Sequence, residues 1–567
     1  MKALRALLKR SVTLRLLARR GRVNTYAYPR WRSILEHDRA VWDAARARAR
    51  GGPKILIATG VGGHPYAAAL ESLLAVALTL RGADVHLLLC DSVLPACEMA
   101  DTTWFPDHGT FARSGPQASL CDLCFAPAHR AYRALGLPVH HYGEFVPPAE
   151  RRRIEDLVQA LPREALRDHA VNGIKLAEHA TAGALRFYAR GDIDTEPHAE
   201  GVLRRYLTAS HLTMSMAEQL FSQQQFSCAV FQHGIYVPQG VFGDVARARD
   251  VRVVNWNLAY RKRRFLFSHG DTYHRTMMSE PTSNWEDLDL QPPLEGALLD
   301  YLKSRWNGSR DWIGFHDRPI EDVDVIAREL GLDLSKPCVG LLTNVIWDAQ
   351  IHYPANAFKS MVDWVIQTIA YFARRPELQL IVRIHPAEIR GTLKSRQPMM
   401  HEIAAAFPEL PKNVFVIPPE QAISTYAVML KCDSVIIFGT KTGVELTSLG
   451  IPLIVAGEAW IRGKGISMDA STADEYFRLL DKLPIGSRLA EPEVRRARTY
   501  AYHFFFRRMI PIEHMRPTEG WLPYRLDVKR LSQCMPGESR GLDTVCRGIL
   551  DGSEFVYPEE QGGSTVE

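Results

Sequence analysis

The chain has 567 residues, of which 46% are apolar and 23% are charged, and its formal net charge is +5. A chain of this length exceeds what one hydrophobic core supports, so two or three domains are expected. The composition is that of a soluble globular protein. No run of about 18 apolar residues, the length that would span a bilayer, occurs in the sequence. Apart from the short basic stretch 261–264, no pattern typical of a nucleic-acid-binding module occurs, so no nucleic-acid partner is expected.

Residues 1–50 form a basic N-terminal arm. All eight charged side chains of residues 1–22 are Lys or Arg, and leucines recur among them at roughly helical spacing. This pattern predicts a basic amphipathic helix that lies on an anionic membrane surface; a solvated helix or a disordered arm is the alternative. Because arginines interrupt any apolar core, a cleaved signal peptide is not expected. The protein is therefore expected in the cytoplasm or peripherally at the inner face of the cell membrane.

Four of the nine cysteines lie close together in the sequence. Cys90, Cys97, Cys121 and Cys124 include a Cys-x-x-Cys pair at 121–124. Four thiolates are the ligand set of a structural zinc ion or of an iron–sulfur cluster. Separate buried thiols are the alternative, because the first pair does not have the Cys-x-x-Cys spacing.

The first α/β domain is predicted over residues 51–325. A strand, a glycine turn, a helix and a strand follow one another from residue 54, which is a βαβ unit. A less regular helical insertion is expected at about 101–215. The predicted elements are strands at 54–60, 83–89, 228–231 and 251–255, and helices at 65–81 and 240–249.

A second α/β domain is predicted over residues 335–490. Apolar strand-like runs again alternate with helical patterns, so the fold class is α/β with two Rossmann-like domains facing a cleft. Residues 491–567 read as a late helix and a polar, flexible tail. The predicted elements are strands at 337–343, 380–384, 414–417, 434–438 and 452–455, and helices at 355–373 and 423–432 and from residue 442.

Two histidines of the first domain follow predicted strands. His64 closes the turn Gly-Val-Gly-Gly-His at 60–64, and His233 follows the strand at 228–231. Side chains at the carboxyl ends of parallel strands face the ligand-binding edge of a sheet. An imidazole there could take a proton from a sugar hydroxyl at neutral pH. The alternatives are a helix-capping role for His64 and a structural role for His233.

Polar clusters follow two strands of the second domain. In Arg383-Ile-His385-Pro386 the proline fixes the backbone, so His385 is expected to be held rigidly where it can bond a nucleotide phosphate. Arg383 lies on the same strand face and either adds charge there or is buried.

The turn at 436–445 leads directly into a helical pattern. Gly439, Thr440, Thr442 and Gly443 predict a donor-rich turn for phosphate, and Glu445 could accept hydrogen bonds from ribose hydroxyls. A capping box of Thr442 and Glu445 is the alternative.

Two further loops are expected at the same edge. Asn344 begins the loop after the strand at 337–343, and Arg462 and Lys464 lie between glycines in the loop at 457–465. Basic side chains in that loop could hold a phosphate. A solvated loop is the alternative.

With these residues in view, the chain resembles the two-domain GT-B glycosyltransferases of bacterial surface-polysaccharide synthesis. The nearest resemblance is to capsule polysaccharide biosynthesis proteins of the Kdo-transferase kind, and teichoic-acid-type glycerophosphate polymerases are more distant. The chain departs from these families in its cysteine group and in having no obvious acidic base beside the first glycine turn. The matching motifs are the first glycine turn at 60–64, His233-Gly234, His385-Pro386, the turn at 440–445, Gly450-Ile-Pro452 and the loop at 459–467.

The resemblance implies an inverting transfer that requires no bound cofactor. The second domain would hold a nucleotide-sugar donor, such as a CMP-Kdo-like sugar. The first would hold a lipid-linked or oligosaccharide acceptor, with His64 or His233 as the base. A sugar-nucleotide 2-epimerase, a glycerophosphotransferase of the same fold and a non-catalytic assembly protein are the alternatives.

Overall fold

The computed structural model divides into two compact units, each built on its own β-sheet. The expected α/β class with two Rossmann-like domains is therefore confirmed, and the cleft between them stays a prediction. The basic arm lies mostly outside the described residues. The structure describes residues 28–116, 118–315, 319–348, 355–518 and 523–558. Of these residues, 28–188, 193–273 and 508–557 belong to the first unit, and 189–192, 274–507 and 558 belong to the second, with the gaps just given.

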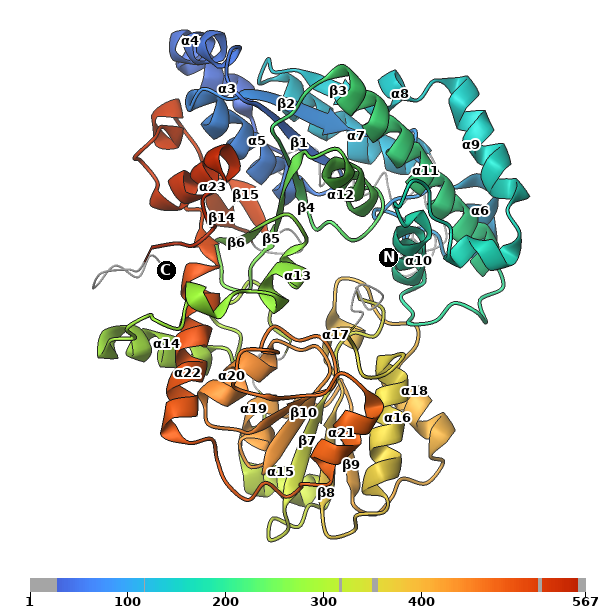
Figure 1. Ribbon diagram of the computed structural model, residues 1–567, viewed down its shortest axis with the longest axis vertical. Coiled ribbons are helices and arrows are strands. Elements are labelled where there is room, and N and C mark those ends of the chain that lie inside the picture. Colours follow the sequence, from blue (N-terminus) through green and yellow to red (C-terminus); the bar gives the residue numbers. More distant parts are fainter. Residues whose placement is uncertain (1–27, 117, 316–318, 349–354, 519–522, 559–567) are drawn as a thin grey trace, which may run out of the picture. The chain divides into compact units, whose positions relative to one another are not determined.

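The first unit contains a seven-stranded sheet in the order β13-β6-β5-β4-β1-β2-β3 (Figure 1). The strands from β5 to β3 run parallel, and β6 and β13 extend the sheet antiparallel. Strands β1 and β4 are almost wholly buried, as expected for a parallel sheet covered on both faces. The strands are β1 (Lys54–Gly60), β2 (Asp84–Leu89), β3 (Val139–His141), β4 (Cys228–Gln232), β5 (Arg252–Leu258), β6 (Arg264–His269) and β13 (Ile510–Pro511).

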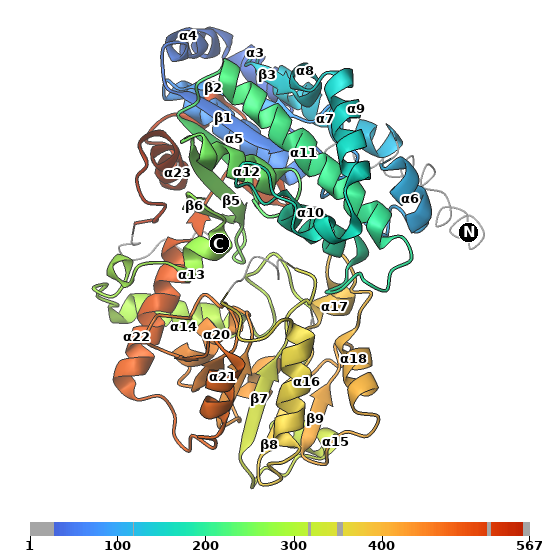
Figure 2. The ribbon, with the colours of Figure 1, turned by 45° about the vertical axis from the view of Figure 1, so that its right-hand side comes forward.

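Helices cover this sheet, and the long helix α11 runs beside α10 and α12 (Figure 2). The expected helical insertion is present, but it also supplies β3, which joins the sheet beside β2. The helices are α3 (Trp31–His37), α4 (Arg39–Ala49), α5 (Pro65–Leu80), α6 (His108–Ser114), α7 (Ala118–Arg133), α8 (Tyr142–Phe145), α9 (Pro148–Ala160), α10 (Leu176–Tyr188), α11 (Ala199–Gln223), α12 (Gln239–Ala248) and α23 (Arg540–Asp551).

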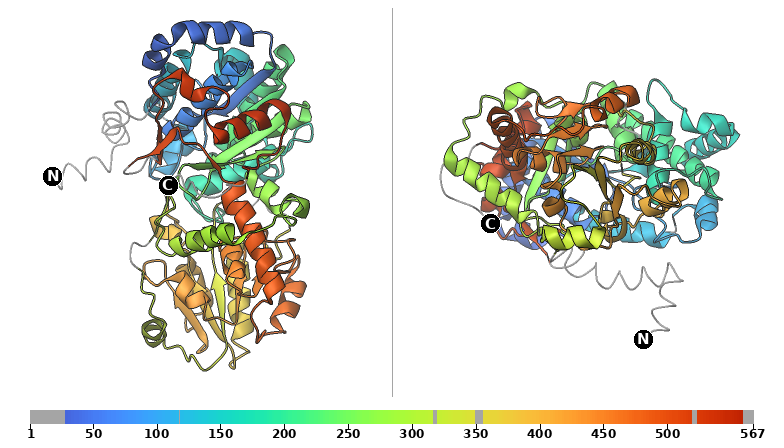
Figure 3. Two further views of the ribbon diagram at one scale, coloured as in Figure 1. Left: turned by 90° about the vertical axis from the view of Figure 1, so that its left-hand side faces the viewer. Right: turned by 90° about the horizontal axis from the view of Figure 1, so that it is seen from below.

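Residues 508–557 return to the first unit instead of forming the expected flexible tail, and residues 559–567 of that tail lie outside the described residues. Strand β13 pairs with β6, a small hairpin follows at β14 (Met515–Pro517) and β15 (Tyr524–Leu526), and α23 packs against α5 (Figure 3). The order extends past α23 because Phe555 is fully buried and stacks on His269 with ring centroids 4.3 Å apart. An aromatic side chain in a polar tail was the signal for this packing.

The second unit contains a six-stranded parallel sheet in the order β12-β11-β10-β7-β8-β9. Its core includes Trp364 of α16, Val339 of β7 and Leu380 of β8. The strands are β7 (Cys338–Leu342), β8 (Gln379–Arg383), β9 (Val414–Ile417), β10 (Ser434–Ile437), β11 (Leu453–Val455) and β12 (Met468–Asp469). The helices are α13 (Tyr273–Met278), α14 (Pro292–Ser304), α15 (Val323–Leu330), α16 (Met361–Phe372), α17 (Ala387–Arg390), α18 (Met399–Ala406), α19 (Thr425–Met429), α20 (Thr442–Ser448), α21 (Ala473–Leu480) and α22 (Glu491–Tyr502).

The second unit begins near residue 274, earlier than the expected 335. The segment expected to be a linker belongs to it because α14 packs on α22, where Arg498 Nη1 donates to Glu295 Oε1 at 2.7 Å. Among the described residues, no helix has both the length and the apolar character needed to cross a bilayer.

Candidate functional site

The first glycine turn presents His64 at the carboxyl end of β1. Gly60 adopts φ +71°, a left-handed conformation that glycine tolerates best. His64 is the N-cap residue of α5, but its side chain makes no capping hydrogen bond. Instead, its Nε2 lies 3.3 Å from Glu98 Oε1. The ring is therefore oriented by a carboxylate, and the capping alternative does not describe it.

Glu98 is the acidic residue that the sequence did not reveal beside this turn. Its side chain is 7% exposed, and its Oε1 accepts a hydrogen bond of 2.8 Å from Gln239 Nε2. Burial would raise the pKa of Glu98, but the hydrogen bond and charge of His64, followed by the charge of Arg186, lower it to about 2. Glu98 is thus an ionised carboxylate at neutral pH. It lies in the loop after β2, so only the sheet order brings it to the first turn.

His233 approaches the same carboxylate from β4. Its backbone lies in the left-handed region at φ +64°, and its N–H donates to the Trp256 carbonyl at 3.0 Å. The imidazole packs on Tyr236 with ring centroids 5.0 Å apart, and its charge contributes to the low pKa of Glu98. The structure thus brings both predicted histidines to one buried anion.

A second buried carboxylate lies beneath the turn. Glu71 of α5 is 2% exposed and accepts hydrogen bonds from Thr59, from Tyr132 at 2.9 Å and from Trp256 at 3.3 Å. Burial raises the pKa of Glu71 to about 7, more than these hydrogen bonds lower it. The Thr59 hydroxyl also accepts the Gln232 N–H at 2.9 Å, so it links β1 to β4 while it donates to the Glu71 carboxyl group.

We expect Glu71→Gln to change the pH dependence of stability. A carboxyl group with a pKa near 7 in the folded state and 4.5 otherwise stabilises the fold fully below pH 4.5, and this contribution is lost as pH rises to about 7. The variant keeps the size and shape of the side chain and one acceptor oxygen but does not titrate, so relative to wild type it should gain up to about 3 kcal/mol between pH 4.5 and pH 8. Denaturant unfolding at both pH values measures this gain. The exposed Glu36→Gln should show no such gain, and equal behaviour of the two variants would refute the assignment.

In the second unit, His385 follows β8 in a fixed position. Its backbone N–H donates to Thr343 Oγ1 at 3.0 Å, and its Nδ1 accepts the Ala387 N–H at 3.1 Å. Burial, followed by the charges of Lys441 and Arg383, lowers the pKa of His385 to about 3, so the ring is neutral. Because Nδ1 is an acceptor, the proton is on Nε2, which is available as a donor to an anion. Pro386 is the N-cap of α17.

The turn after β10 brings Lys441 to this edge of the sheet. Lys441, and not Thr442, is the N-cap of α20, and the Thr440 and Thr442 hydroxyls lie 3.2 Å apart. Burial, followed by the charge of Arg305, lowers the pKa of Lys441 to about 8. The charge of Lys441 in turn lowers the pKa of His385, and the two residues follow β10 and β8, the strands on either side of β7, at the carboxyl edge of the sheet. The sequence of this turn contains the lysine, but no motif distinguishes it from its neighbours.

Glycines at the turn allow close packing with the Asn344 loop. A side chain at Gly439 would approach Asn344 Nδ2 to 3.5 Å and the Glu458 carbonyl to 3.2 Å, and one at Gly443 would meet Leu453 at 2.7 Å. Asn344 Oδ1 is buried and makes no hydrogen bond. The turn, Asn344, Lys441 and His385 thus form one group at the carboxyl edge of β7, β8 and β10.

Glu445 has a different role from the one expected. Its side chain is 1% exposed, and its Oε2 lies 2.9 Å from Arg305 Nε and accepts the Tyr426 hydroxyl. Its Oε1 lies 3.8 Å from Lys441 Nζ. The expected contact with ribose and the alternative capping box are therefore both replaced by a buried ion cluster, which also includes Asp311, a partner of Arg305. Glu445 positions Lys441 rather than facing solvent.

Three basic residues considered for a phosphate contact, Arg383, Arg462 and Lys464, bond backbone carbonyl groups instead. Arg383 donates to the carbonyls of Pro418 at 2.7 Å and Gln421 at 3.2 Å, which secures the loop after β9. Arg462 donates to the Ala470 carbonyl at 2.7 Å and thereby braces its own loop. Lys464 is 2% exposed, and its Nζ donates to the Met278 carbonyl at 2.8 Å. Long cationic side chains here satisfy buried carbonyl groups, a role that sequence spacing does not reveal.

The four clustered cysteines line one cavity with Gly60 and Val61. They are free thiols, and burial raises the pKa of each, to about 11 for Cys90. Metal ligation requires thiolates in a compact shell. Within the described part of the chain, no group of three or more His, Cys, Asp or Glu side chains is placed to hold a metal ion. The arrangement of Cys90, Cys97, Cys121 and Cys124 therefore does not support the zinc or iron–sulfur prediction.

The resemblance expected from the motifs is confirmed over part of the chain. Residues 324–484 match the family model described as capsule polysaccharide biosynthesis protein. This segment contains Asn344, His385, Lys441 and Glu445. No curated protein matches the chain.

Solved structures of low sequence identity are also similar to the chain. The beta Kdo 2,4 transferase KpsC of Thermosulfurimonas dismutans is 14% identical, with 48% of this chain and 79% of that chain covered and a TM-score of 0.32. Its beta Kdo 2,7 transferase counterpart is 12% identical over 50% and 79% of the two chains, with a TM-score of 0.29. The UDP-GlcNAc 2-epimerase of Neisseria meningitidis is 10% identical over 79% and 98%, with a TM-score of 0.25.

Proposed function

We propose that the protein is an inverting glycosyltransferase of surface-polysaccharide synthesis. The donor is a nucleotide-activated sugar such as a CMP-Kdo-like sugar, and the acceptor is a lipid-linked or oligosaccharide chain at the cytoplasmic face of the membrane. The observation that carries the proposal is that Lys441 and His385 follow β10 and β8 at one edge of the parallel sheet, inside the segment that matches the capsule family.

The chemistry of this pair suits a phosphate. Lys441 supplies a positive charge, and His385 Nε2 supplies a directed hydrogen bond that does not depend on protonation of the ring. During transfer, negative charge develops on the phosphate oxygen as its bond to the anomeric carbon breaks. Fixed donors and charges that face this oxygen lower the barrier because they need no reorganisation. Asn344 is available for a further contact with the nucleotide.

The first unit supplies the proton acceptor. The His64 Nε2 proton is directed at Glu98 Oε1, which leaves Nδ1 to accept the proton of the attacking hydroxyl group. As the acceptor oxygen forms its bond to the anomeric carbon, the ionised Glu98 stabilises the resulting imidazolium. His233, beside the same carboxylate, adds to the polar surface that receives the hydroxyl group. In this proposal the first unit provides the base, and the second unit stabilises the leaving phosphate.

The test is a thermal-shift screen of the full chain with CMP, CDP, UDP, GDP and their sugars, in wild type and in Lys441→Gln. At one hundred times its dissociation constant, a bound nucleotide should stabilise the wild type by about 2.7 kcal/mol. Loss of a charged hydrogen bond of about 1.5–3 kcal/mol should weaken binding roughly 10- to 100-fold in the variant. Wild-type affinity should also fall as pH rises through about 8, where Lys441 loses its proton.

The exposed Lys431→Gln, which removes the same charge from the same unit, is the matched control and should bind like wild type. If no nucleotide stabilises the wild type, the donor site and the transferase function are both refuted. If nucleotides bind but Lys441→Gln and Lys431→Gln behave alike, the nucleotide lies elsewhere.

A further inference from the structure

A polar pocket lies apart from the histidines around Glu98, at the far end of the first sheet. Asp91 follows β2 and His141 ends β3, so both lie at the carboxyl edge of neighbouring parallel strands. Phe125 and His129 come from α7, and Arg151 comes from α9. The carboxyl edge of such a sheet is where α/β proteins bind ligands. The pocket therefore occupies a ligand-binding position that the site described above does not use.

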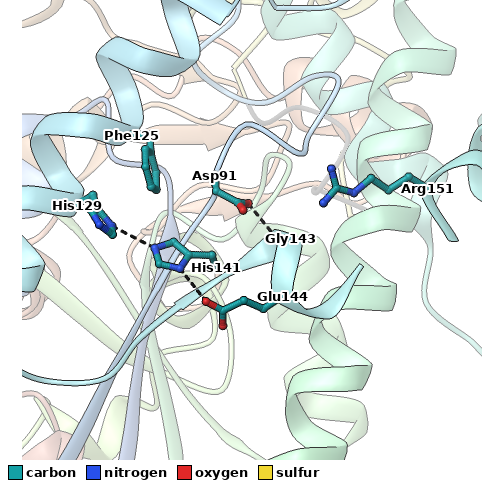
Figure 4. A pocket seen from close by; sticks show the side chains of 7 residues that line it. All are labelled: Asp91, Phe125, His129, His141, Gly143, Glu144 and Arg151. Carbon is teal, nitrogen blue, oxygen red and sulfur yellow. Dashed lines mark hydrogen bonds and ion pairs between the residues drawn. The ribbon is translucent and has the colours of Figure 1, made fainter. Parts of the chain in front are cut away.

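The side chains of this pocket are held in place by hydrogen bonds. His141 Nδ1 lies 2.8 Å from Glu144 Oε1, and His141 Nε2 lies 3.1 Å from His129 Nδ1 (Figure 4). The ring of Phe125 stacks on His129 with centroids 4.8 Å apart and meets His141 edge-on at 5.6 Å. One wall of the pocket is thus formed by three rings that stack or meet edge-on, and the Glu144 carboxylate extends it with polar atoms.

The opposite wall contains the Asp91 carboxylate and the Arg151 guanidinium group, each of which bonds a different backbone group. Asp91 Oδ1 accepts the Gly143 N–H at 3.0 Å, and Arg151 Nε donates to the Val146 carbonyl at 2.7 Å. A side chain at Gly143 would meet Asp91 Oδ2 at 2.5 Å and Arg151 Nη2 at 3.0 Å, so glycine keeps this space open. Figure 4 shows the Arg151 fork pointing toward Asp91 across the pocket.

The charges select the class of ligand. One guanidinium group faces two carboxylates, Asp91 and Glu144, so a phosphate would meet more negative than positive charge. Hydroxyl groups both donate and accept, which matches carboxylate acceptors and a guanidinium donor at once. The aromatic wall suits the apolar face of a sugar ring. We propose that this pocket binds an uncharged saccharide ring of the acceptor chain, away from the hydroxyl group that reacts.

This inference rests on the proposed transferase function for the identity of the acceptor, but it can be tested by binding alone. The probe is full-length protein labelled with ¹³C at histidine Cε1, titrated with the methyl glycosides of glucose, galactose and N-acetylglucosamine, and separately with inorganic phosphate. The signals of His129 and His141, assigned from His129→Gln and His141→Gln, should shift saturably with at least one glycoside and not with phosphate.

Arg151→Ala and Asp91→Asn should each weaken this binding roughly tenfold or more. Arg152→Ala is the matched control, because Arg152 is the next residue of α9 and is exposed. Absence of a glycoside response in the wild type, an equal response to phosphate, or an equal loss in Arg152→Ala would each overturn the proposal. Since the nucleotide screen reports on the second unit, a normal nucleotide response without glycoside binding refutes this pocket alone. Glycoside binding without any nucleotide response refutes the transferase function instead.

Discussion

Replacing His64 by alanine is expected to lower turnover about 10²- to 10⁴-fold, the usual contribution of a positioned general base. Nucleotide binding should be unchanged, because Lys441 and His385 belong to the other unit. The measurement is the release of free nucleotide from the donor that gives the largest thermal shift, in the presence of a lipid-linked or oligosaccharide acceptor. A variant with wild-type turnover would remove His64 from the mechanism.

Two further variants sharpen this result. Glu98→Gln keeps the shape of the side chain but removes its charge, so turnover should fall less than in His64→Ala and its pH profile should change. His233→Ala should spare nucleotide binding and lower turnover. The exposed His37→Ala is the control, since His37 lies in α3, away from the residues around Glu98.

Removal of Arg305 should have the largest effect on stability. Arg305→Ala leaves Glu445 buried beside Tyr426 without its main counter-charge, and breaking a buried ion pair in this way costs about 3–5 kcal/mol. Denaturant unfolding of the full chain should show a transition at clearly lower denaturant concentration. Glu445→Ala should have a comparable effect and should also weaken nucleotide binding, because Lys441 loses its neighbour.

The exposed Arg374→Ala is the matched control, because it removes an arginine from the same unit without disturbing a buried pair. Its expected change is within about 0.5 kcal/mol. If Arg305→Ala unfolds at the same denaturant concentration as Arg374→Ala, the cluster around Glu445 does not hold the unit together.

Most strands of the two sheets were predictable from the sequence because a parallel strand buried on both faces is a continuous apolar run. Strands β3, β6, β12 and β13 were not predicted. The predicted strand at 54–60 coincides with β1, and that at 414–417 coincides with β9. Strand β6 was missed because it begins in the basic stretch 261–264, where Arg264 is in fact buried. In a sequence, an arginine within a strand indicates an exposed position, and only the structure shows the contacts that allow it to be buried.

The candidate site was predictable only where a residue follows its own strand. His64, His233 and His385 satisfy that rule, and sheet order then places them at the ligand-binding edges. Arg305 and Glu98 depend on contacts between distant segments, so no local pattern indicates them. The same reason explains why Lys464 was wrongly expected at a phosphate, and it decides the open question of Arg383 in favour of burial. Both long side chains reach carbonyl groups rather than the site.

The return of residues 508–557 to the first sheet has a consequence for biosynthesis. Strand β13 and helix α23 follow residues 274–507 in the chain, so the sheet of the first unit cannot be completed until residues 510–511 have also been synthesised. Apart from residues 189–192 and Pro558, the described residues of the second unit lie within one stretch of the chain, 274–507, and this stretch can fold earlier. The order of maturation thus reverses the order of synthesis, and a nascent chain that stops at residue 507 would carry a finished C-terminal unit and an N-terminal sheet with an unpaired edge.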